Sequence, residues 1–408
     1  MIRYWLLTTL WATVVWGAVE EYTIKRPDAV LRQGPGSYFA VVAELPVGAL
    51  LEVEAEERGW YKGRSGDMQG YVSKKATLAR GKRDDIFGRM GAQRPVSKVS
   101  QHGVSAGIKG FAEKVLPHLK GGEGPLQELL DYRIDAAAYQ RFRASTYASL
   151  DLAMVQADLP LPPRQDEVFF TFSEQGMGLA VASRIGEMGL YRDPDLQAYL
   201  NYVGQLVVEA GEAYDTGFKF FILDHDSFNA MACPGGLVFV TRGLLQGLRS
   251  EAELACVLGH EIAHISRYHG MREMEKRKVR IVAEDAFAEL AAEVEPAVQE
   301  RLAMERELEQ IGLDIYERLV AGRLAEYEEE ADAVGLLYAA RAGYDPRAVL
   351  ALLARQKGAA AGANAHYGPT QINERLARLQ GQLQQMDLPP GLRAHAVRFT
   401  ETVRAGGH

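Results

Sequence analysis

The sequence predicts a multidomain protein in which a small all-β barrel precedes a mainly α-helical domain that contains a small β-sheet. Between residues 20 and 79, short β-rich runs alternate with Gly and Pro turn residues. Beyond residue 110, most apolar residues recur at helical spacing instead. An apolar β-type run at 237–241 interrupts this pattern and directly precedes a helix that begins at Ser250, so we expect a sheet beside that helix.

Length and composition are those of a globular protein with two or three domains. The chain has 408 residues, of which 47% are hydrophobic and 25% charged. Its formal net charge of -8 gives no reason to expect nucleic acid as a partner. With Cys233 and Cys256 as the two cysteines, no disulfide framework is expected.

Residues 1–18 have the pattern of an export signal. Arg3 supplies the positive charge, and Tyr4 to Trp16 form the apolar core of the signal. We expect cleavage after Gly17 or Ala18 and an exported chain that is periplasmic or extracytoplasmic. The alternative is an uncleaved membrane anchor, for which this apolar run is short. No other segment approaches the length of a membrane span, so no transmembrane domain is expected in the mature chain.

Composition shifts divide the chain into segments. The segments are a signal peptide (1–18), a barrel (20–79), a linker (80–110), a helical connecting region (111–165), the main domain (166–385) and a C-terminal tail (386–408). The linker mixes charge, Gly and Pro without periodicity. In the main domain, Asp193 and Pro194 predict the start of a helix that runs to about residue 213. A strand is expected at 218–224, with 237–241 as its hairpin partner across a Gly-Gly turn.

The helix that begins at Ser250 carries the motif His260-Glu261-x-x-His264. Positions i and i+4 share one helix face, so both imidazoles can bind one metal ion while Glu261 lies beside it. Ser250 and Glu253 form a capping box that specifies the helix start. The alternative is two surface histidines on an acidic helix. Apolar neighbours argue against it, because paired histidines on a buried helix need a partner.

Two other residues near this motif are candidates for lesser roles. Cys256 lies one turn before His260, where it is either a thiolate ligand or a buried small apolar residue, and the second role is favoured. His269 lies five residues after His264. On a continuous helix it would occupy a different face, so we expect it at the surface.

A further ligand, either a carboxylate or another His, must come from a downstream segment of the chain. A catalytic zinc keeps three protein ligands and leaves a fourth position for water. The acidic segment 326–332 is the obvious source, and composition does not choose among its members. These are Glu326, Glu328, Glu329, Glu330 and Asp332.

Three motifs in order carry a resemblance to a known family. They are NAMACPGGLVFVTRGLL, SEAELACVLGHEIAHISRYHG and EYEEEADAVGLLYAARAGYDP. Together they resemble the HtpX-like and CaaX-prenyl-protease-like zinc metallopeptidases, in particular the soluble exported BepA/LoiP-type branch, over about 167–379. The resemblance implies a gluzincin-type fold, one Zn²⁺ per chain, and hydrolysis of peptide bonds. It also implies that the substrates are unfolded or misassembled cell-envelope proteins.

The same resemblance implies roles for individual residues. The family's E-x-x-x-D pattern maps onto Glu328 and Asp332, which makes Glu328 the third ligand beside His260 and His264. Asp332 would orient a ligand histidine. Glu261 would be the general base that takes a proton from the zinc-bound water and passes it to the leaving amine.

The segment after the third ligand departs from the family pattern. Family members carry a His-Pro followed by an Arg, whereas this chain has Gly368 at the expected His and one inserted residue. Arg375 matches the Arg, and His366 stands two residues upstream as a substitute for the His. His366 and Arg375 are therefore candidate catalytic residues, and whether they act at the site or latch the zinc stays open.

The N-terminal segment resembles the bacterial Src-homology-3-like domains. The resemblance is carried by Leu31-Arg32 before Gly34-Pro35, by Leu45 and Gly48, by Gly59-Trp60-Tyr61 and by Gly70-Tyr71-Val72. It implies a cell-wall or peptide ligand for this domain. Trp60 and Tyr61 either line such a ligand site or form part of the core, and the small size of the domain favours the core.

Polypeptide substrates are expected to bind as an added strand on the edge of the small sheet. The sequence leaves two alternative functions. The first is a chaperone or adaptor with a structural zinc, which would not require Glu261. The second is a cell-wall amidase, suggested by the barrel and disfavoured by the edge-strand motif around Pro234.

Overall fold

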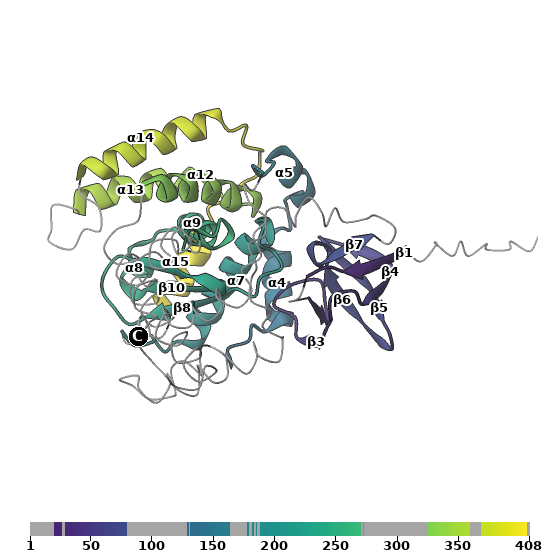
Figure 1. Ribbon diagram of the computed structural model, residues 1–408. Coiled ribbons are helices and arrows are strands. Elements are labelled where there is room, and N and C mark those ends of the chain that lie inside the picture. The colour runs from purple at the N-terminus through teal and green to yellow at the C-terminus, as the bar shows by residue number, and fades with distance from the viewer. Residues whose placement is uncertain are drawn as a thin grey trace, which may run out of the picture. The chain divides into compact units, whose positions relative to one another are not determined.

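The structure is a computed structural model. It describes residues 20–26, 29–79, 129, 131–163, 178, 182, 185, 188–270, 272, 325–359 and 369–405. The chain divides into two compact units, Met1–Ser97 and Lys98–His408, and each is described by itself (Figure 1). The expected signal peptide and linker lie outside the described residues. No helix in the described part of the chain has the length and apolar composition that a bilayer crossing requires.

The N-terminal unit is an antiparallel sheet of seven strands in the order β3-β2-β6-β5-β4-β1-β7. Its elements are β1 (Glu20–Ile24), β2 (Val30–Arg32), β3 (Val41–Glu44), β4 (Leu50–Glu57), β5 (Trp60–Ser65), β6 (Met68–Ser73), η1 (Lys74–Ala76) and β7 (Thr77–Ala79). The predicted small all-β domain is thus confirmed. Within the described residues, however, the edge strands β3 and β7 are not paired with each other, so the sheet is not a closed barrel.

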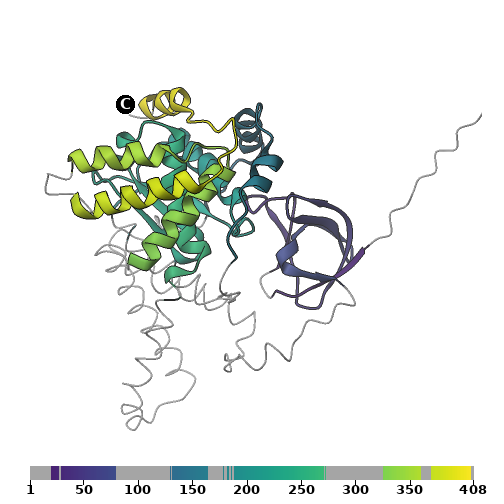
Figure 2. The same ribbon diagram turned by 90° about the horizontal axis from the view of Figure 1, so that it is seen from above.

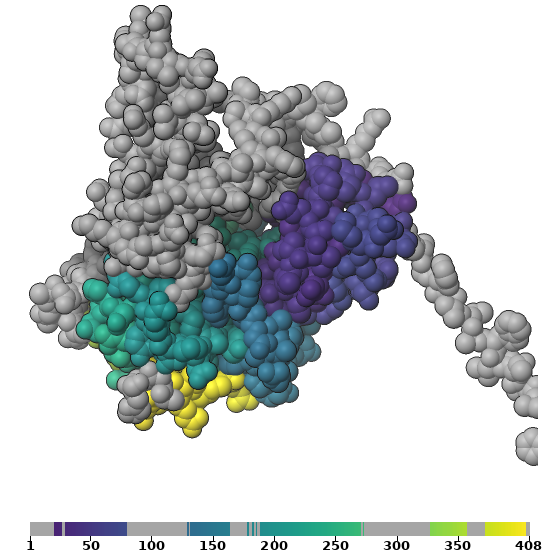
Figure 3. Space-filling model, turned by 90° about the horizontal axis from the view of Figure 1, so that it is seen from below, coloured from purple at the N-terminus to yellow at the C-terminus, as the bar shows by residue number. Residues whose placement is uncertain are grey.

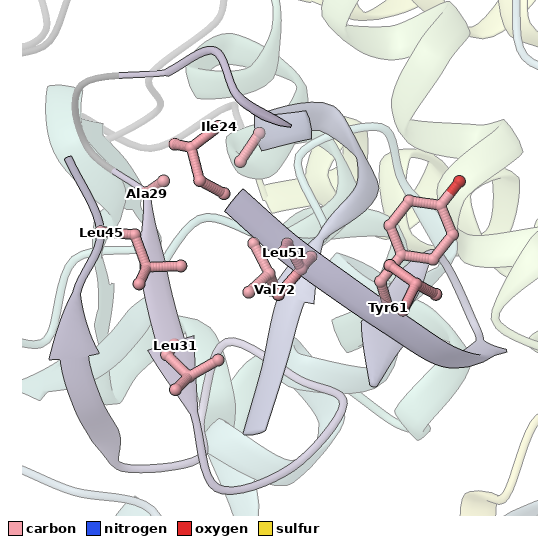
Figure 4. Close-up of a cluster of buried hydrophobic side chains, with 9 residues drawn as sticks. Ile24, Ala29, Leu31, Leu45, Leu51, Tyr61 and Val72 are labelled. Atoms are coloured by element: carbon pink, nitrogen blue, oxygen red, sulfur yellow. The ribbon is translucent and has the colours of Figure 1, made fainter. Parts of the chain in front are cut away.

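Inward-facing side chains of this sheet form one apolar core (Figure 4). The cluster contains Ile24, Ala29, Leu31, Leu45, Leu51, Val53, Tyr61, Val72 and Ala76. Trp60 is 3% exposed and Tyr61 is 8% exposed. Their burial supports the core role over an exposed ligand surface for both rings.

The C-terminal unit is mainly helical and contains a small sheet, as the sequence predicts. Its helices are α4 (Ala136–Thr146), α5 (Leu152–Asp158), α7 (Pro194–Ala210), α8 (Arg242–Gly247), α9 (Glu251–Ser266), α12 (Ala325–Arg341), α13 (Ala348–Ala359), α14 (Pro369–Gln385) and α15 (Ala396–Ala405). Its strands are β8 (Lys219–Leu223), β9 (Ala230–Cys233) and β10 (Leu237–Thr241), with η3 (Pro234–Gly236) between the last two. The views from the side and from above show α12, α13 and α14 on the same side of this unit (Figures 1 and 2).

Helix α7 begins where the sequence predicts and anchors the sheet. The Asp193 side chain accepts a hydrogen bond from the backbone N–H of Leu196 at 2.9 Å, and Pro194 occupies the first turn. From the buried face of α7, Asn201 accepts from the N–H of Phe220 at 3.0 Å and donates to its carbonyl at 2.8 Å. One buried amide thereby satisfies both backbone groups of a β8 residue and fixes strand to helix.

The expected hairpin between 218–224 and 237–241 is wrong. Strand β10 runs parallel to β8, and its hairpin partner is β9, so the order is β8-β10-β9. No strand was expected between these two runs, but the four residues of β9 are all buried and pair with β10. Gly235 and Gly236, with φ of 80° and 103°, make the tight turn between β9 and β10. Their positive φ values are readily adopted by glycine.

Helices α9 and α12 cross at a pair of glycines. A Cβ atom on Gly259 would lie 2.5 Å from the carbonyl oxygen of Gly335, and a Cβ on Gly335 would lie 2.6 Å from the backbone nitrogen of His260. Such distances are below van der Waals contact, so neither position accommodates a side chain without movement. The two backbones therefore approach closely directly beside His260.

The C-terminal segment is bound to the start of α9. Arg398 of α15 pairs with the Glu251 carboxylate, which is 0% exposed. Tyr199 and Tyr344 donate hydroxyl hydrogen bonds to the same carboxylate at 2.8 Å and 3.2 Å. Arg398 also donates to the Thr146 hydroxyl at 3.0 Å, consistent with the neighbouring yellow and blue surfaces in Figure 3. The segment predicted as a C-terminal tail thus contains a packed helix.

We expect Gly335→Ala to destabilise the protein, because the added methyl group forces α12 away from α9. The cost of such overpacking is about 1–3 kcal/mol. Gly381→Ala on α14 is the matched control, since a Cβ there meets nothing within 4 Å. The control should be neutral or stabilising by up to about 1 kcal/mol. Urea denaturation measures both, and wild-type stability of Gly335→Ala would show that the crossing is not tight.

Arg398→Ala should destabilise the protein more strongly, because it leaves the buried Glu251 carboxylate without its cation. Breaking a buried ion pair costs about 3–5 kcal/mol. Arg347→Ala removes an ion pair with Asp345 in which the arginine side chain is 63% exposed, and this control should cost at most about 1 kcal/mol. The free energy of unfolding from the same denaturation experiment compares the two. Equal losses would contradict the assigned role of Arg398.

Candidate metal centre

Three buried side chains from two helices meet where α9 crosses α12. His260 and His264 come from α9, and Glu328 comes from α12, so the structure brings together the three predicted ligands. One ligating atom from each lies within 4.8 Å of the others. The Nε2 atoms of the two histidines are 3.1 Å apart. The Glu328 oxygens lie 3.3 Å from Nε2 of His260 and 3.4 Å from Nε2 of His264.

The donor set and its dimensions fit a zinc ion. Zinc binds imidazole nitrogen and carboxylate oxygen at about 2.0–2.2 Å in tetrahedral geometry, so neighbouring ligand atoms should be about 3.3–3.6 Å apart. The two histidine nitrogens are 3.1 Å apart, and each lies 3.3 or 3.4 Å from a different oxygen of Glu328, so every one of these pairs is close to this range. Two histidines and one glutamate are also a ligand set typical of catalytic zinc, in which a fourth position remains for water.

Asp332 contacts His260 at Nδ1, the ring nitrogen that does not face Glu328. Its Oδ1 atom lies 2.9 Å from Nδ1 of His260, one helical turn after Glu328. Arg375 donates to both Asp332 oxygens, at 2.6 Å and 2.9 Å, and Arg378 donates at 2.9 Å. Burial would raise the pKa of Asp332, but the Arg375 charge and the His260 hydrogen bond hold it well below its usual range. Asp332 is therefore an ionised acceptor that fixes the His260 ring.

The carboxylates also act on the protonation of His260. Burial alone would lower the pKa of His260, but hydrogen bonds with Asp332 and Glu328 raise it to about 9. A histidine ligand must present a bare nitrogen, so cation binding here releases a proton.

Arg375 lies on the Asp332 side of the centre. Its guanidinium pairs with Asp332, and one of its nitrogens lies 3.4 Å from Nδ1 of His260. This contact is with the nitrogen of His260 that faces Asp332 and not Glu328. Arg378, on the next turn of α14, was missed by the sequence analysis. Its i+3 spacing from Arg375 indicates that the two arginines lie on the same face of a helix.

The expectation that His269 lies at the surface is wrong. His269 is 3% exposed, and its Nδ1 atom lies 2.8 Å from Nδ1 of His264. The error came from extending α9 as one helix, whereas α9 ends at Ser266 and Tyr268 has a φ of 55°. This left-handed residue redirects the chain after α9, so that the His269 ring lies against His264. Burial lowers the pKa of His269 to about 4.

The other candidates lie away from the ligand set. The Cys256 sulfur lies 3.7 Å from the carbonyl of Pro346, and burial raises the pKa of its thiol. It does not belong to the metal-binding group found among the described residues, which supports the buried apolar role. Glu329 is exposed and pairs with Arg378 at 3.2 Å.

Glu261 is 4% exposed and directly follows the ligand His260 on α9. The segment 360–368, which includes His366 and Gly368, lies outside the described residues. The role of His366 therefore stays a prediction.

At its start, α9 is capped by Ser250, which accepts from the N–H of Glu253 at 3.2 Å, as the capping box predicts. The Glu253 carboxylate accepts from the N–H of Arg249 at 2.8 Å.

Asp332→Asn should weaken zinc binding, because the neutral amide loses the charge that holds His260 in its ligating orientation. Loss of such a supporting contact costs roughly 10–100-fold in metal affinity. Competition with a chromogenic chelator measures the affinity. Glu329→Gln removes an exposed carboxylate three residues away and should bind zinc like the wild type. Equal affinity of Asp332→Asn and the control would contradict the supporting role of Asp332.

Comparison with known proteins agrees with this geometry. Residues 194–383 match the model of peptidase family M48, and residues 25–77 match that of the bacterial SH3 domain. The family resemblances that the sequence motifs carry are thereby confirmed.

Three curated relatives illustrate the match. The beta-barrel assembly-enhancing protease of Escherichia coli (strain K12) is 30% identical over 173 residues, which is 40% of this chain and 33% of that protein. Its namesake from Yersinia pestis is 30% identical over 167 residues, 39% of this chain and 32% of that protein. The mitochondrial metalloendopeptidase OMA1 of Arabidopsis thaliana is 32% identical over 130 residues, 32% of this chain and 24% of that protein. The aligned part spans about a third or less of each relative. This chain therefore carries a peptidase family M48 domain that follows a bacterial SH3 domain.

Proposed function

We propose that this chain is a zinc-dependent endopeptidase that hydrolyses peptide bonds of unfolded or misassembled cell-envelope proteins. The observation that carries the proposal is the buried triangle of His260, His264 and Glu328 on two crossing helices, with Glu261 next to it in sequence. A structural zinc is normally closed by four protein ligands, whereas the group found among the described residues supplies three. Membership of the central domain in peptidase family M48 supports the same reaction.

Each residue of the centre has a defined task in this proposal. When bound, zinc acidifies a water molecule and polarises the peptide carbonyl. Glu261 takes the proton from the attacking water at its carboxylate and then delivers it to the nitrogen of the leaving amine. Asp332 holds the ring of His260, and Arg375 holds Asp332. Arg375 is therefore assigned a positioning task.

Substrate binding is proposed along β9. In the part of the chain that the structure describes, β9 is hydrogen-bonded to β10 and forms an edge of the sheet. The same strand packs against α9, which carries the metal ligands. An extended peptide that pairs with such an edge presents its backbone carbonyls in a row, a binding mode that is independent of side-chain sequence. This mode suits unfolded polypeptides.

Cell-envelope substrates are proposed on two grounds. Residues 1–18 have the pattern of an export signal. Two similar proteins are named beta-barrel assembly-enhancing proteases. We also propose that the chain is exported to the periplasm or another extracytoplasmic space.

For the bacterial SH3 domain we propose a cell-wall or peptide ligand.

Glu261→Gln should retain one zinc per chain and lose cleavage of unfolded casein, because the amide cannot accept the proton. General-base catalysis contributes about 10²–10⁴-fold, so the loss should be of this size. Zinc content is determined by elemental analysis, and cleavage by release of soluble peptides. Glu401→Gln, an exposed carboxylate on α15, is the matched control and should cleave like the wild type.

Two results would contradict the proposed function. Wild-type protein that holds zinc but cleaves no peptide would favour a binding module with a structural metal. Cleavage by Glu261→Gln at the wild-type rate would remove Glu261 from the role of base.

A further inference from the structure

The two histidines of the metal centre are supported by different partners. Nδ1 of His260 lies 2.9 Å from a carboxylate oxygen of Asp332. Nδ1 of His264 lies instead 2.8 Å from Nδ1 of another histidine, His269, and their rings meet edge to face at 80°. The second ring nitrogen of His269 lies 3.2 Å from an oxygen of Glu330. A continuous path of side chains thus leads from His264 outward to Glu330.

The direction of each hydrogen bond along this path follows from the ligating atom. Nε2 of His264 faces Glu328, so Nε2 is the nitrogen that meets the metal. The proton of a neutral His264 must then sit on Nδ1, which donates to Nδ1 of His269. His269 therefore accepts at Nδ1 and carries its own proton on Nε2. That proton is donated to the Glu330 carboxylate, whose oxygen lies 3.2 Å from Nε2 of His269.

The surroundings of His269 hold its ring in this position. Its ring stacks on Tyr327 with 4.7 Å between centroids and an angle of 18° between planes. Arg272 donates to the same Glu330 oxygen at 3.1 Å. Tyr327 and Glu330 stand on either side of the ligand Glu328 in α12, so one short stretch of helix supplies a ligand and both supports of His269.

The backbone before His269 is adapted to this placement. Tyr268 has a φ of 55°, a left-handed conformation that is unfavourable for a residue with a side chain. Such a conformation persists where surrounding contacts determine it, and it clusters at functional sites. Here it reverses the chain after α9, so that His269 reaches back to His264.

We propose that His269 is a positioning residue of the metal centre, which fixes the ring and tautomer of His264 through a His264-His269-Glu330 relay. The proposal rests on the proposed zinc site. It assigns to His269 the task toward His264 that Asp332 has toward His260. The centre then has two unlike supports, a direct carboxylate for one ligand and an imidazole backed by a carboxylate for the other.

Three substitutions test the relay through zinc affinity, measured by competition with a chromogenic chelator. His269→Phe keeps the ring and its stacking on Tyr327 but removes both nitrogens, and zinc binding should weaken by roughly 10–100-fold. His269→Asn places an amide oxygen near the position of Nδ1, where it can accept from His264, so part of the affinity should return. Glu330→Ala leaves the His269 ring in place without its acceptor and should weaken binding less than His269→Phe.

His225→Asn is the matched control, because this histidine is exposed and bonds to Ser227 on a surface loop. It should bind zinc like the wild type. Thermal melting of the zinc-stripped variants tests whether the fold is retained. Were His269→Phe not to fold, Glu330→Ala would decide the question by itself, since this glutamate is 31% exposed and its loss should be tolerated.

The outcomes separate the relay from the enzyme assignment. Weakened zinc binding in His269→Phe with partial recovery in His269→Asn supports the relay. The relay would be overturned by wild-type affinity in His269→Phe, or by equal losses in His269→Phe and His269→Asn. If His269→Phe does not fold, wild-type affinity in Glu330→Ala would overturn it. None of these results would contradict the proposed peptidase. Failure of the wild-type chain to bind zinc at all would overturn the proposed function and the relay together.

Discussion

The metal centre depends on the close approach of α9 and α12 at Gly259 and Gly335. Carboxylate side chains are short, so Glu328 reaches the two histidines only where the helix backbones come nearly into contact. At the same crossing, Asp332 meets the ring of His260 from behind. Because these two glycines have no side chains, the helices come close enough for the two histidines, Glu328 and Asp332 to meet. The other elements of the domain hold the two helices in this arrangement.

Buried charge is the second constraint, and the domain satisfies it by pairing. Asp332 is surrounded by His260 and two arginines of α14, so its ionised form is stabilised although it is 4% exposed. Glu251 at the start of α9 has Arg398 and two tyrosine hydroxyls as partners. A buried carboxylate without such partners would be strongly unfavourable. Because these partners come from α7, α14, α15 and the segment between α12 and α13, distant parts of the sequence hold α9 at its start and at His260.

Local patterns predicted much of this structure, and long-range contacts explain what they missed. The start of α9 at Ser250, the start of α7 at Asp193 and the paired histidines follow from residues near one another in sequence. The third ligand could be identified only through the family resemblance, because the five acidic residues on this helix are chemically alike. The packing of the helix against α9 selects among them. His269 was misplaced because the left-handed Tyr268 redirects the chain after α9, which hydrophobic periodicity does not show. The Gly-Gly turn was expected, but β9 before it was missed because its four small or apolar residues carry no alternating pattern.

X-ray absorption at the zinc edge is the most direct test of the proposed ligands, because it reports them without reference to activity. We expect one zinc per chain with a first shell of nitrogen and oxygen at about 2.0–2.2 Å and an outer-shell pattern of two imidazoles. A sulfur shell at about 2.3 Å would place the metal on a cysteine and contradict the assignment. A shell without imidazole would do the same, since it would place zinc away from the crossing of α9 and α12.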